Sequence, residues 1–170
     1  MSAVMLMGCN ASLPPLETVD HVVLDRFMGD WYVIANIPTF VEKGAHNAVE
    51  SYRLEDDGSI ATTFTFRQDG FDGPEKIYRP RGFVRNKRTN AEWGMQFIWP
   101  FKSDYRITWL DNDYSETVIG RNNRDYVWIM ARTPQISSAS YQRMVEHIRA
   151  SGYDTSLLVK VPQQSHEARP

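Results

Sequence analysis

Hydrophobic and polar residues alternate with a period of two along most of this chain, in short stretches that end at turn residues. The clearest stretch covers 91–99, where one face carries Ala91, Trp93, Met95, Phe97 and Trp99. Such alternation is typical of a half-buried β-strand. Further stretches predict strands at 31–37, 48–54, 60–67, 76–85, 104–110, 115–120 and 126–132. About eight antiparallel strands of this kind close into an up-and-down barrel, an all-β fold with room for one small ligand.

Turn residues support this division into strands. Asp56, Asp57 and Gly58 form a strong hairpin signal between the second and third stretches. Pro80 falls inside the fourth stretch, where it indicates a bulge or an edge position because proline cannot donate to a strand ladder. Pro134 ends the last stretch.

The hydrophobic period changes at 137–150 to that of an α-helix. One face of this segment carries Tyr141, Met144, Val145 and Ile148. Ser137 or Ser138 is placed to cap its start, and Gly152 stands where a helix commonly ends. We expect the helix to pack against the outside of the barrel, followed by a short strand at 157–161.

Length and charge fit one compact domain. A chain of 170 residues buries enough surface to need no disulfide or metal. Its net charge of -2 gives no basic field for nucleic acid, so we expect no nucleic-acid partner. The expected parts are a leader at 1–9, a tether at 10–23, the barrel domain with its helix at 24–161, and a polar tail at 162–170.

The first and last predicted strands carry a tryptophan and an arginine that can contact each other. Gly29 lets the chain turn into a strand, and Trp31 can then close one end of the barrel. Arg132, from the last strand, can place its guanidinium on the indole, a contact worth about 0.5 to 2 kcal/mol. Together with the Leu110–Tyr114 segment between them, these motifs resemble the lipocalins, from about residue 24 to 161. Within that family the likeness is to the bacterial outer-membrane lipoproteins and to their animal relative apolipoprotein D. The resemblance implies that Gly29, Trp31 and Arg132 brace the barrel floor.

Cys9, the single cysteine, follows Leu6, Met7 and Gly8. A small residue before a cysteine, after a short apolar run, resembles the lipobox of bacterial lipoproteins. The resemblance implies cleavage before Cys9, a lipid on its new N-terminus, and anchoring to the outer membrane on its periplasmic side. Because the apolar run is shorter than a normal signal sequence, two interpretations stay open: translation starts further upstream, or Cys9 is an ordinary residue of the terminus.

Side-chain parity indicates which residues face the barrel interior. If Trp31 points inward, Val33 and Ala35 share its face. The same reasoning on the other strands predicts a deep apolar cavity for an acyl chain, with Tyr105 and Tyr126 as hydrogen-bonding groups near the mouth. The expected ligand-binding residues are Phe64, Phe66, Trp93, Met95, Phe97, Tyr105, Ile107, Trp109, Tyr126, Trp128 and Met130.

The sequence gives little support for a catalytic site. The histidines are scattered, with no spacing typical of a metal site, at His21, His46, His147 and His166. The sequence has no nucleophile elbow, P-loop or dinucleotide glycine motif. Carboxylates such as Glu50, Glu75 and Asp113 are expected on outer faces or in turns. We therefore expect no enzyme, and no metal or cofactor.

The resemblance implies a carrier that binds, stores or transports a fatty acid or lysophospholipid in the bacterial cell envelope. Three alternatives stay open: a binder of haem or a pigment, an enzyme that modifies a lipid or pigment, and an interaction protein whose barrel is filled. Proteins of this kind can form homodimers, although no residue here requires it.

Overall fold

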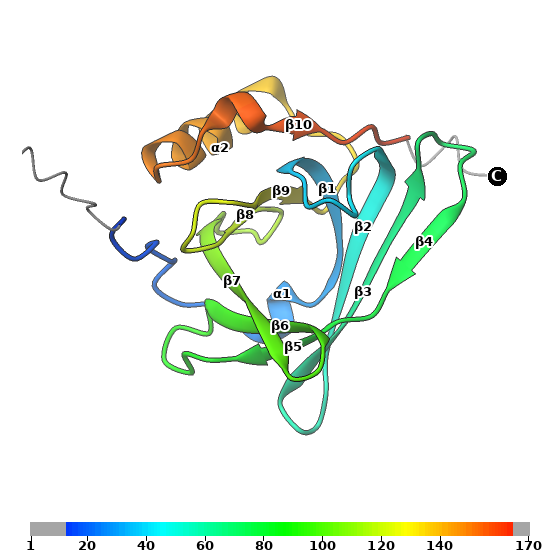
Figure 1. Cartoon of the computed structure of the whole chain (residues 1–170). Coiled ribbons are helices and arrows are strands. Elements are labelled where there is room, and N and C mark those ends of the chain that lie inside the picture. Colours follow the sequence, from blue (N-terminus) through cyan, green and yellow to red (C-terminus); the bar gives the residue numbers. More distant parts are fainter. Residues whose placement is uncertain (1–12, 165–170) are drawn as a thin grey trace, which may run out of the picture.

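Eight antiparallel strands close into a barrel in the computed structural model, which describes residues 13–164 (Figure 1). The barrel strands are β1 (Gly29–Ile37), β2 (Ala45–Leu54), β3 (Ser59–Gln68), β4 with β5 (Glu75–Tyr78 and Arg81–Val84), β6 (Glu92–Ile98), β7 (Phe101–Leu110), β8 (Glu116–Gly120) and β9 (Val127–Ala131). We count β4 and β5 as one interrupted strand, because both pair with β3. The predicted fold class is confirmed.

The first and last barrel strands complete the closure. β1 pairs with β2 on one side and with β9 on the other, where Tyr32 stands opposite Ala131 and Ile37 opposite Val127. A further short strand, β10 (Val159–Lys160), pairs with Ala35 and Asn36 of β1, beyond the part of β1 that pairs with β2. The interruption between β4 and β5 falls at Pro80, whose carbonyl accepts a bond of 3.2 Å from the Thr62 amide.

Two helices lie at different sides of the barrel. The short α1 (Leu24–Phe27) lies across one end and forms the floor, while α2 (Ser138–Ala150) packs on the outside (Figure 1). Ser137 caps α2 by accepting a bond of 3.0 Å from the Ser140 amide, as its sequence position predicts. Met144 and Ile148 of α2 are buried in a cluster with outward-facing residues of the barrel. A one-turn helix, η1 (Thr155–Leu157), joins α2 to β10.

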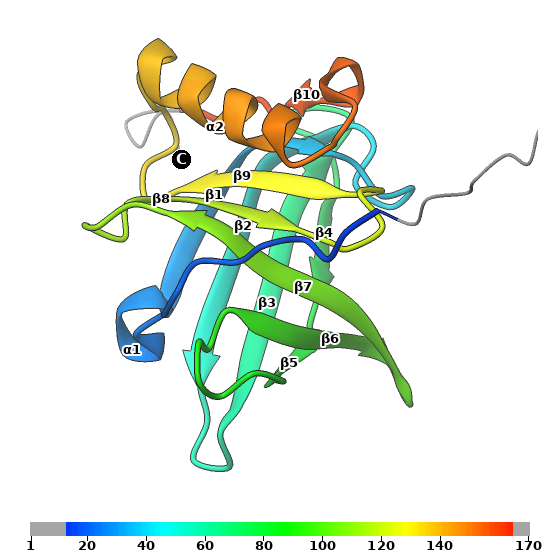
Figure 2. The same ribbon diagram turned by 90° about the vertical axis from the view of Figure 1, so that its left-hand side faces the viewer.

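The segment before α1 is held against the barrel. Its backbone amides donate from Val19 to the Ile107 carbonyl at 3.0 Å and from Val22 to the Thr89 carbonyl at 2.7 Å. Leu16 and Val22 are buried, and the segment runs along the barrel beside β7 and β8 (Figure 2). From Leu16 onward the chain is therefore not the free tether that its polar composition predicts. Cys9 and the rest of the expected leader lie outside the described residues.

Two β-bulges reverse the inward and outward alternation of side chains. In β1 the register shifts between Val33 and Ala35, so that Val33 belongs to the interior cluster and Ala35 to the cluster beneath α2. In β7 it shifts between Ile107 and Trp109 with the same effect. An extra residue in one strand changes the face of everything that follows it. The parity predictions for Ala35 and Trp109 are therefore wrong.

Candidate ligand-binding site

The barrel floor is built around Trp31 and Arg132. The Arg132 Cζ atom lies 3.8 Å from the centroid of the Trp31 ring, as the sequence predicts, and the indole Nε1 donates to the Phe27 carbonyl at 2.8 Å. Gly29 enters β1 with a φ of 91°, a conformation that strains any residue with a side chain. This end of the barrel is thus closed by packed groups whose polar atoms are paired.

An aromatic layer lies directly above this floor. Phe27 meets Trp93 edge to face at 5.5 Å between ring centroids, and Trp93 stacks on Tyr105 at 4.9 Å. Tyr52 meets Trp93 edge to face at 5.8 Å. Because Phe27 and Trp93 are fully buried, a ligand that enters from the open end stops at this layer.

A cavity of about 440 Å³ fills the barrel above the aromatic layer. This volume lies within the usual range for small-molecule sites. Its residues come from every barrel position except β1 and β8, and from the turns between strands. They are Thr39, Phe40, Val41, Glu42, Glu50, Thr62, Phe64, Tyr78, Arg79, Pro80, Met95, Phe97, Ile98, Ser103, Asp104, Tyr105, Arg121 and Trp128.

A chain of hydroxyl groups ends at a carboxyl group in the deep part of this cavity. Tyr105 and Tyr52 hydroxyls lie 2.7 Å apart, and the Tyr52 hydroxyl donates to Glu50. Tyr52 has a single hydroxyl proton, which it donates to Glu50. In the bond between the two tyrosines Tyr105 is therefore the donor and Tyr52 the acceptor. Glu50 keeps some accessible surface because it faces the cavity, but burial raises its pKa to about 7, with Glu42 as a smaller cause. The carboxyl thus keeps its proton to a higher pH than an exposed glutamate does.

Glu42 is a second buried carboxylate, nearer the open end. It accepts bonds from the Trp128 Nε1 at 2.7 Å, from the Thr39 hydroxyl at 2.6 Å and from the Thr39 amide at 2.9 Å. Asn36 adds a longer bond of 3.4 Å. This network fixes the β1–β2 loop against β9 and presents the Trp128 ring to the cavity.

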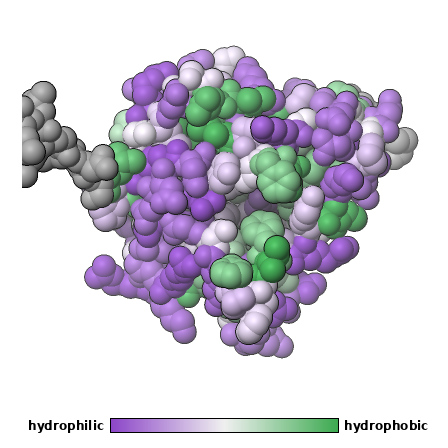
Figure 3. Space-filling model, in the orientation of Figure 1, coloured by the Kyte–Doolittle hydropathy of each residue, from purple (hydrophilic) through white to green (hydrophobic). Residues whose placement is uncertain are grey.

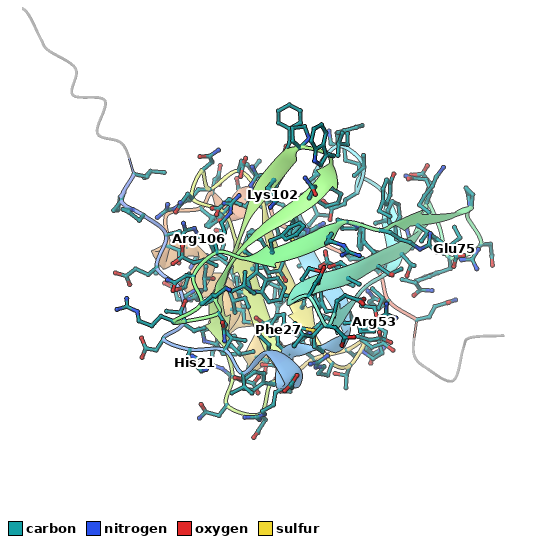
Figure 4. The ribbon with its side chains drawn as sticks, turned by 90° about the horizontal axis from the view of Figure 1, so that it is seen from below. His21, Phe27, Arg53, Glu75, Lys102 and Arg106 are labelled. Atoms are coloured by element: carbon teal, nitrogen blue, oxygen red, sulfur yellow. The ribbon has the colours of Figure 1, made fainter. Side chains whose placement is uncertain are left out.

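Large apolar side chains surround the mouth without being covered. Figure 3 looks onto this face, where green apolar groups gather around a central hollow. The β6–β7 hairpin, which bears Lys102, projects at the end opposite Phe27 (Figure 4). Exposed fractions between 59% and 83% are found for Phe40, Phe97, Ile98, Trp99 and Phe101. We call these five residues the aromatic rim.

The structure brings together only some of the predicted ligand-binding residues. Those that line the cavity are Phe64, Met95, Phe97, Tyr105 and Trp128. Others are packed into the barrel interior without lining the cavity, namely Phe66, Trp93, Ile107 and Met130. Tyr126 does not line it either and meets the Arg121 guanidinium at 5.2 Å. Trp109 faces the opposite way and packs in the cluster that includes Met144 of α2.

Most polar residues of the cavity were missed by the sequence reasoning, among them the buried or half-buried Glu50, Glu42 and Thr62 at its wall. Glu50 was expected on an outer face and lies inside, which corrects that expectation. The signal was available: Ala48, Glu50 and Tyr52 share one face of β2, and two of them are apolar or aromatic. Glu42 sits in a loop, and Thr62 is a residue type that suits either face, so neither carried a signal.

Within residues 13–164, no group of three histidine, cysteine, aspartate or glutamate side chains is arranged to hold a metal ion. In the same part of the chain no helix is long and apolar enough to span a bilayer.

Known proteins resemble this chain over most of its length. A model of the lipocalin-like domain matches residues 22–163. The chain is 27% identical over 167 residues to the outer membrane lipoprotein Blc of Escherichia coli strain K12, covering 95% of this chain and 92% of that protein. It is 31% identical over 163 residues to the temperature-induced lipocalin-1 of Arabidopsis thaliana, covering 87% and 83%.

A solved structure shows the same fold at low identity. Insecticyanin from the tobacco hornworm Manduca sexta superimposes with a TM-score of 0.70 at 12% identity, over 91% of this chain and 87% of that one.

Proposed function

The chain belongs to the lipocalin family, which binds hydrophobic ligands, and from this premise we propose that it carries a fatty acid or a lysophospholipid in the bacterial cell envelope. The proposed action is non-covalent binding, storage and transport. The observation that carries the proposal is the cavity of about 440 Å³, open at one end and walled by Phe64, Met95 and Trp128. Each methylene that moves from water into such a wall contributes about 0.8 kcal/mol.

Two arginine side chains of the cavity wall, which also carries the carboxylates Glu42 and Asp104, support an anionic head group in this proposal. Arg79 and Arg121 both line the cavity, and Arg121 follows β8 at the end away from the floor. A carboxylate or phosphate placed between acyl chain and solvent is expected to meet the Arg121 guanidinium, a group that binds such anions well. This orientation leaves the acyl chain to run inward along Phe64 and Met95.

The aromatic rim suits contact with a lipid surface. Tryptophan and phenylalanine side chains settle at the boundary between head groups and acyl chains, and Trp99 and Phe101 are exposed on the same hairpin. Lys102 follows them directly, and a basic side chain near an anionic lipid surface contributes about 1 kcal/mol. We propose that the protein exchanges its ligand with a membrane through this face.

The likeness to outer membrane lipoproteins supports an anchored location. Blc of E. coli carries that description in its name, and Cys9 here follows a lipobox-like run. We propose a lipid on Cys9 that holds the protein at the outer membrane, facing the periplasm. Mass spectrometry of membrane-extracted protein is expected to find a diacylglyceryl group on Cys9, and Cys9→Ser is expected to lose membrane association. Unmodified, soluble wild-type protein contradicts the anchor and leaves the carrier function standing.

Native mass spectrometry of the chain tests the carrier function. Titration with palmitate, a lysophospholipid and haem is expected to show one acyl lipid retained per barrel, with quenching of tryptophan fluorescence from Trp128 at the cavity wall. Retention of haem alone favours a pigment carrier. Retention of none of the three contradicts the proposed function.

A further inference from the structure

We propose that the deep end of the cavity is a binding site for a hydrogen-bond donor, a hydroxyl group at the inner end of the ligand. This inference rests on the proposed function, because it assumes an acyl ligand with its anionic head at the mouth. It adds the chemistry of the other end: a chain hydroxylated at or near its terminus, rather than one that ends in a plain methyl group.

Glu50 is the first observation behind this site. It lines the cavity directly above the aromatic layer, where Tyr52 and Tyr105 are nine-tenths buried or more. The hydroxyl chain runs from Tyr105 through Tyr52 to Glu50, so each tyrosine proton is already used within the protein. A carboxylate has several acceptor positions, and Tyr52 occupies one of them. Acceptor capacity therefore remains on Glu50, on the side that faces the cavity.

Thr62 is a second, independent observation. It is 3% exposed and lines the same cavity, and its Oγ1 has no hydrogen-bond partner within the described part of the chain. In the β2–β3 register Thr62 stands opposite Tyr52, on the neighbouring strand to Glu50. Buried polar groups without a partner are uncommon and costly in folded proteins. Two adjacent strands thus present unfilled hydrogen-bonding capacity at one depth of the cavity.

The charge around Glu50 selects the kind of group that fits. Its pKa is raised by burial and by Glu42, and a hydrogen bond from Tyr52 opposes the rise. The other charged groups that line the cavity are Arg79, Asp104 and Arg121, and none of them is a cause of the shift. A carboxylate inserted to this depth meets Glu50 with no cation to separate them, whereas a methyl group leaves Glu50 and Thr62 unsatisfied. A hydroxyl donates to Glu50 and accepts from Thr62.

Matched pairs of ligands test this assignment. The probes are unbranched fatty acids of ten to sixteen carbons and the same acids with a terminal hydroxyl, compared at whichever chain length binds most tightly. The two members of a pair share head group and length, so their affinity ratio reports on the inner end alone. Binding is measured by tryptophan fluorescence at pH 8, on wild-type protein, Glu50→Leu, Thr62→Val and the exposed control Glu75→Leu.

Wild-type protein and Glu75→Leu are expected to bind the hydroxy acid at least as tightly as its parent. Glu50→Leu is expected to shift the affinity ratio toward the parent acid by about tenfold or more, because it removes a charge-assisted hydrogen bond. Thr62→Val, which keeps side-chain shape, is expected to shift it a few-fold in the same direction. Near-ultraviolet circular dichroism checks that each variant is folded, and Thr62→Val carries the test if Glu50→Leu is not.

An equal ratio in wild-type protein, Glu50→Leu and Thr62→Val overturns the inference while the proposed function stands, since acyl chains still bind. Absence of binding for every acid in wild-type protein overturns the proposed function and the inference together.

Discussion

Arg132 lies over the indole of Trp31 at 3.8 Å and binds the backbone on which that indole rests. Its guanidinium donates to main-chain oxygens at 2.8 to 3.2 Å, those of Arg26, Phe27, Met28, Asp30 and Tyr114. One side chain from the end of β9 thus joins α1, the start of β1 and the β7–β8 turn. The floor is stabilised by several N–H donors of one planar group as well as by the cation-π contact. Among the side chains only arginine carries such a group.

Replacement of Arg132 is expected to destabilise the barrel. Arg132→Met loses the cation-π contact and the charge-assisted hydrogen bonds, and we expect a fall of roughly 2 kcal/mol or more in the free energy of unfolding. Arg132→Lys keeps the charge on the ring but cannot bridge the three segments, so its loss is expected to be intermediate. Urea denaturation followed by circular dichroism measures both.

The control for this prediction is Arg53→Met. Arg53 is largely exposed and pairs with Glu55, and such surface changes usually alter stability by less than about 0.5 kcal/mol. Equal stability of Arg132→Met and Arg53→Met would mean that the floor contact contributes nothing.

Trp128 and Trp109 were both predicted to bind the ligand, but we expect their replacement to affect ligand affinity differently. Trp128 lines the cavity, and Trp109 packs on the outer cluster. Trp128→Ala removes apolar wall and the donor to Glu42, so we expect affinity for an acyl ligand to fall about tenfold or more. Trp109→Ala is expected to lower stability but leave the affinity of the folded protein within a factor of two or so. Isothermal titration gives both affinities, and a reversed pattern contradicts the assignment of faces.

The aromatic rim gives a prediction about lipid surfaces. Trp99→Ser combined with Phe101→Ser is expected to reduce association with vesicles of phosphatidylglycerol and phosphatidylethanolamine several-fold, because two interfacial side chains are lost. Leu157→Ser is the control, since Leu157 is also an exposed apolar residue, at 56%, but does not line the mouth. Vesicle flotation of unlipidated protein is the measurement. Equal flotation of all three proteins refutes the proposed role of the rim.

The features that the sequence predicted well are those set by local pattern. The hairpin at Gly58 and the cap at Ser137 depend on single residue types in fixed positions, and the structure has both. The pairing of Trp31 with Arg132 depended on a family pattern, and the contact is present. The barrel fold follows from these signals together with the repeated period of two.

The features that could not be predicted depend on the third dimension. Ala35 and Trp109 lie on the opposite face from the predicted one because a bulge precedes each of them. The residue types at Ile34 and Thr108 give no sign of a bulge in the sequence. Burial of Glu50 is tolerated because Tyr52, on the same face, donates to it. The binding roles of Phe66 and Met130 stay a prediction, since both lie in the barrel interior outside the cavity wall.

Glu50 makes the stability of the barrel depend on pH in a direction opposite to that of most carboxylates. Burial raises its pKa from 4.5 to about 7 in the folded protein. Between these values the folded state binds more protons than the unfolded state, so stability falls as pH rises. The stabilisation relative to an ionised group is fully present below about pH 4.5 and is lost once the pH has passed about 7. A shift of this size corresponds to a change on the order of 3 kcal/mol.

Glu50→Gln separates this contribution from all other titrating groups. The variant keeps an acceptor for Tyr52 but does not ionise, so wild-type protein is expected to lose stability relative to it between pH 5 and pH 8. Thermal or urea unfolding of both proteins at each pH gives the difference, and the other groups cancel because they are common to the pair. Glu42, Tyr52 and Tyr105 face Glu50 in both proteins, and the tyrosines remain neutral over this range because burial raises each pKa above its usual 10. A stability difference that does not change with pH means that the Glu50 carboxyl stays ionised, in contact with water at the deep end of the cavity.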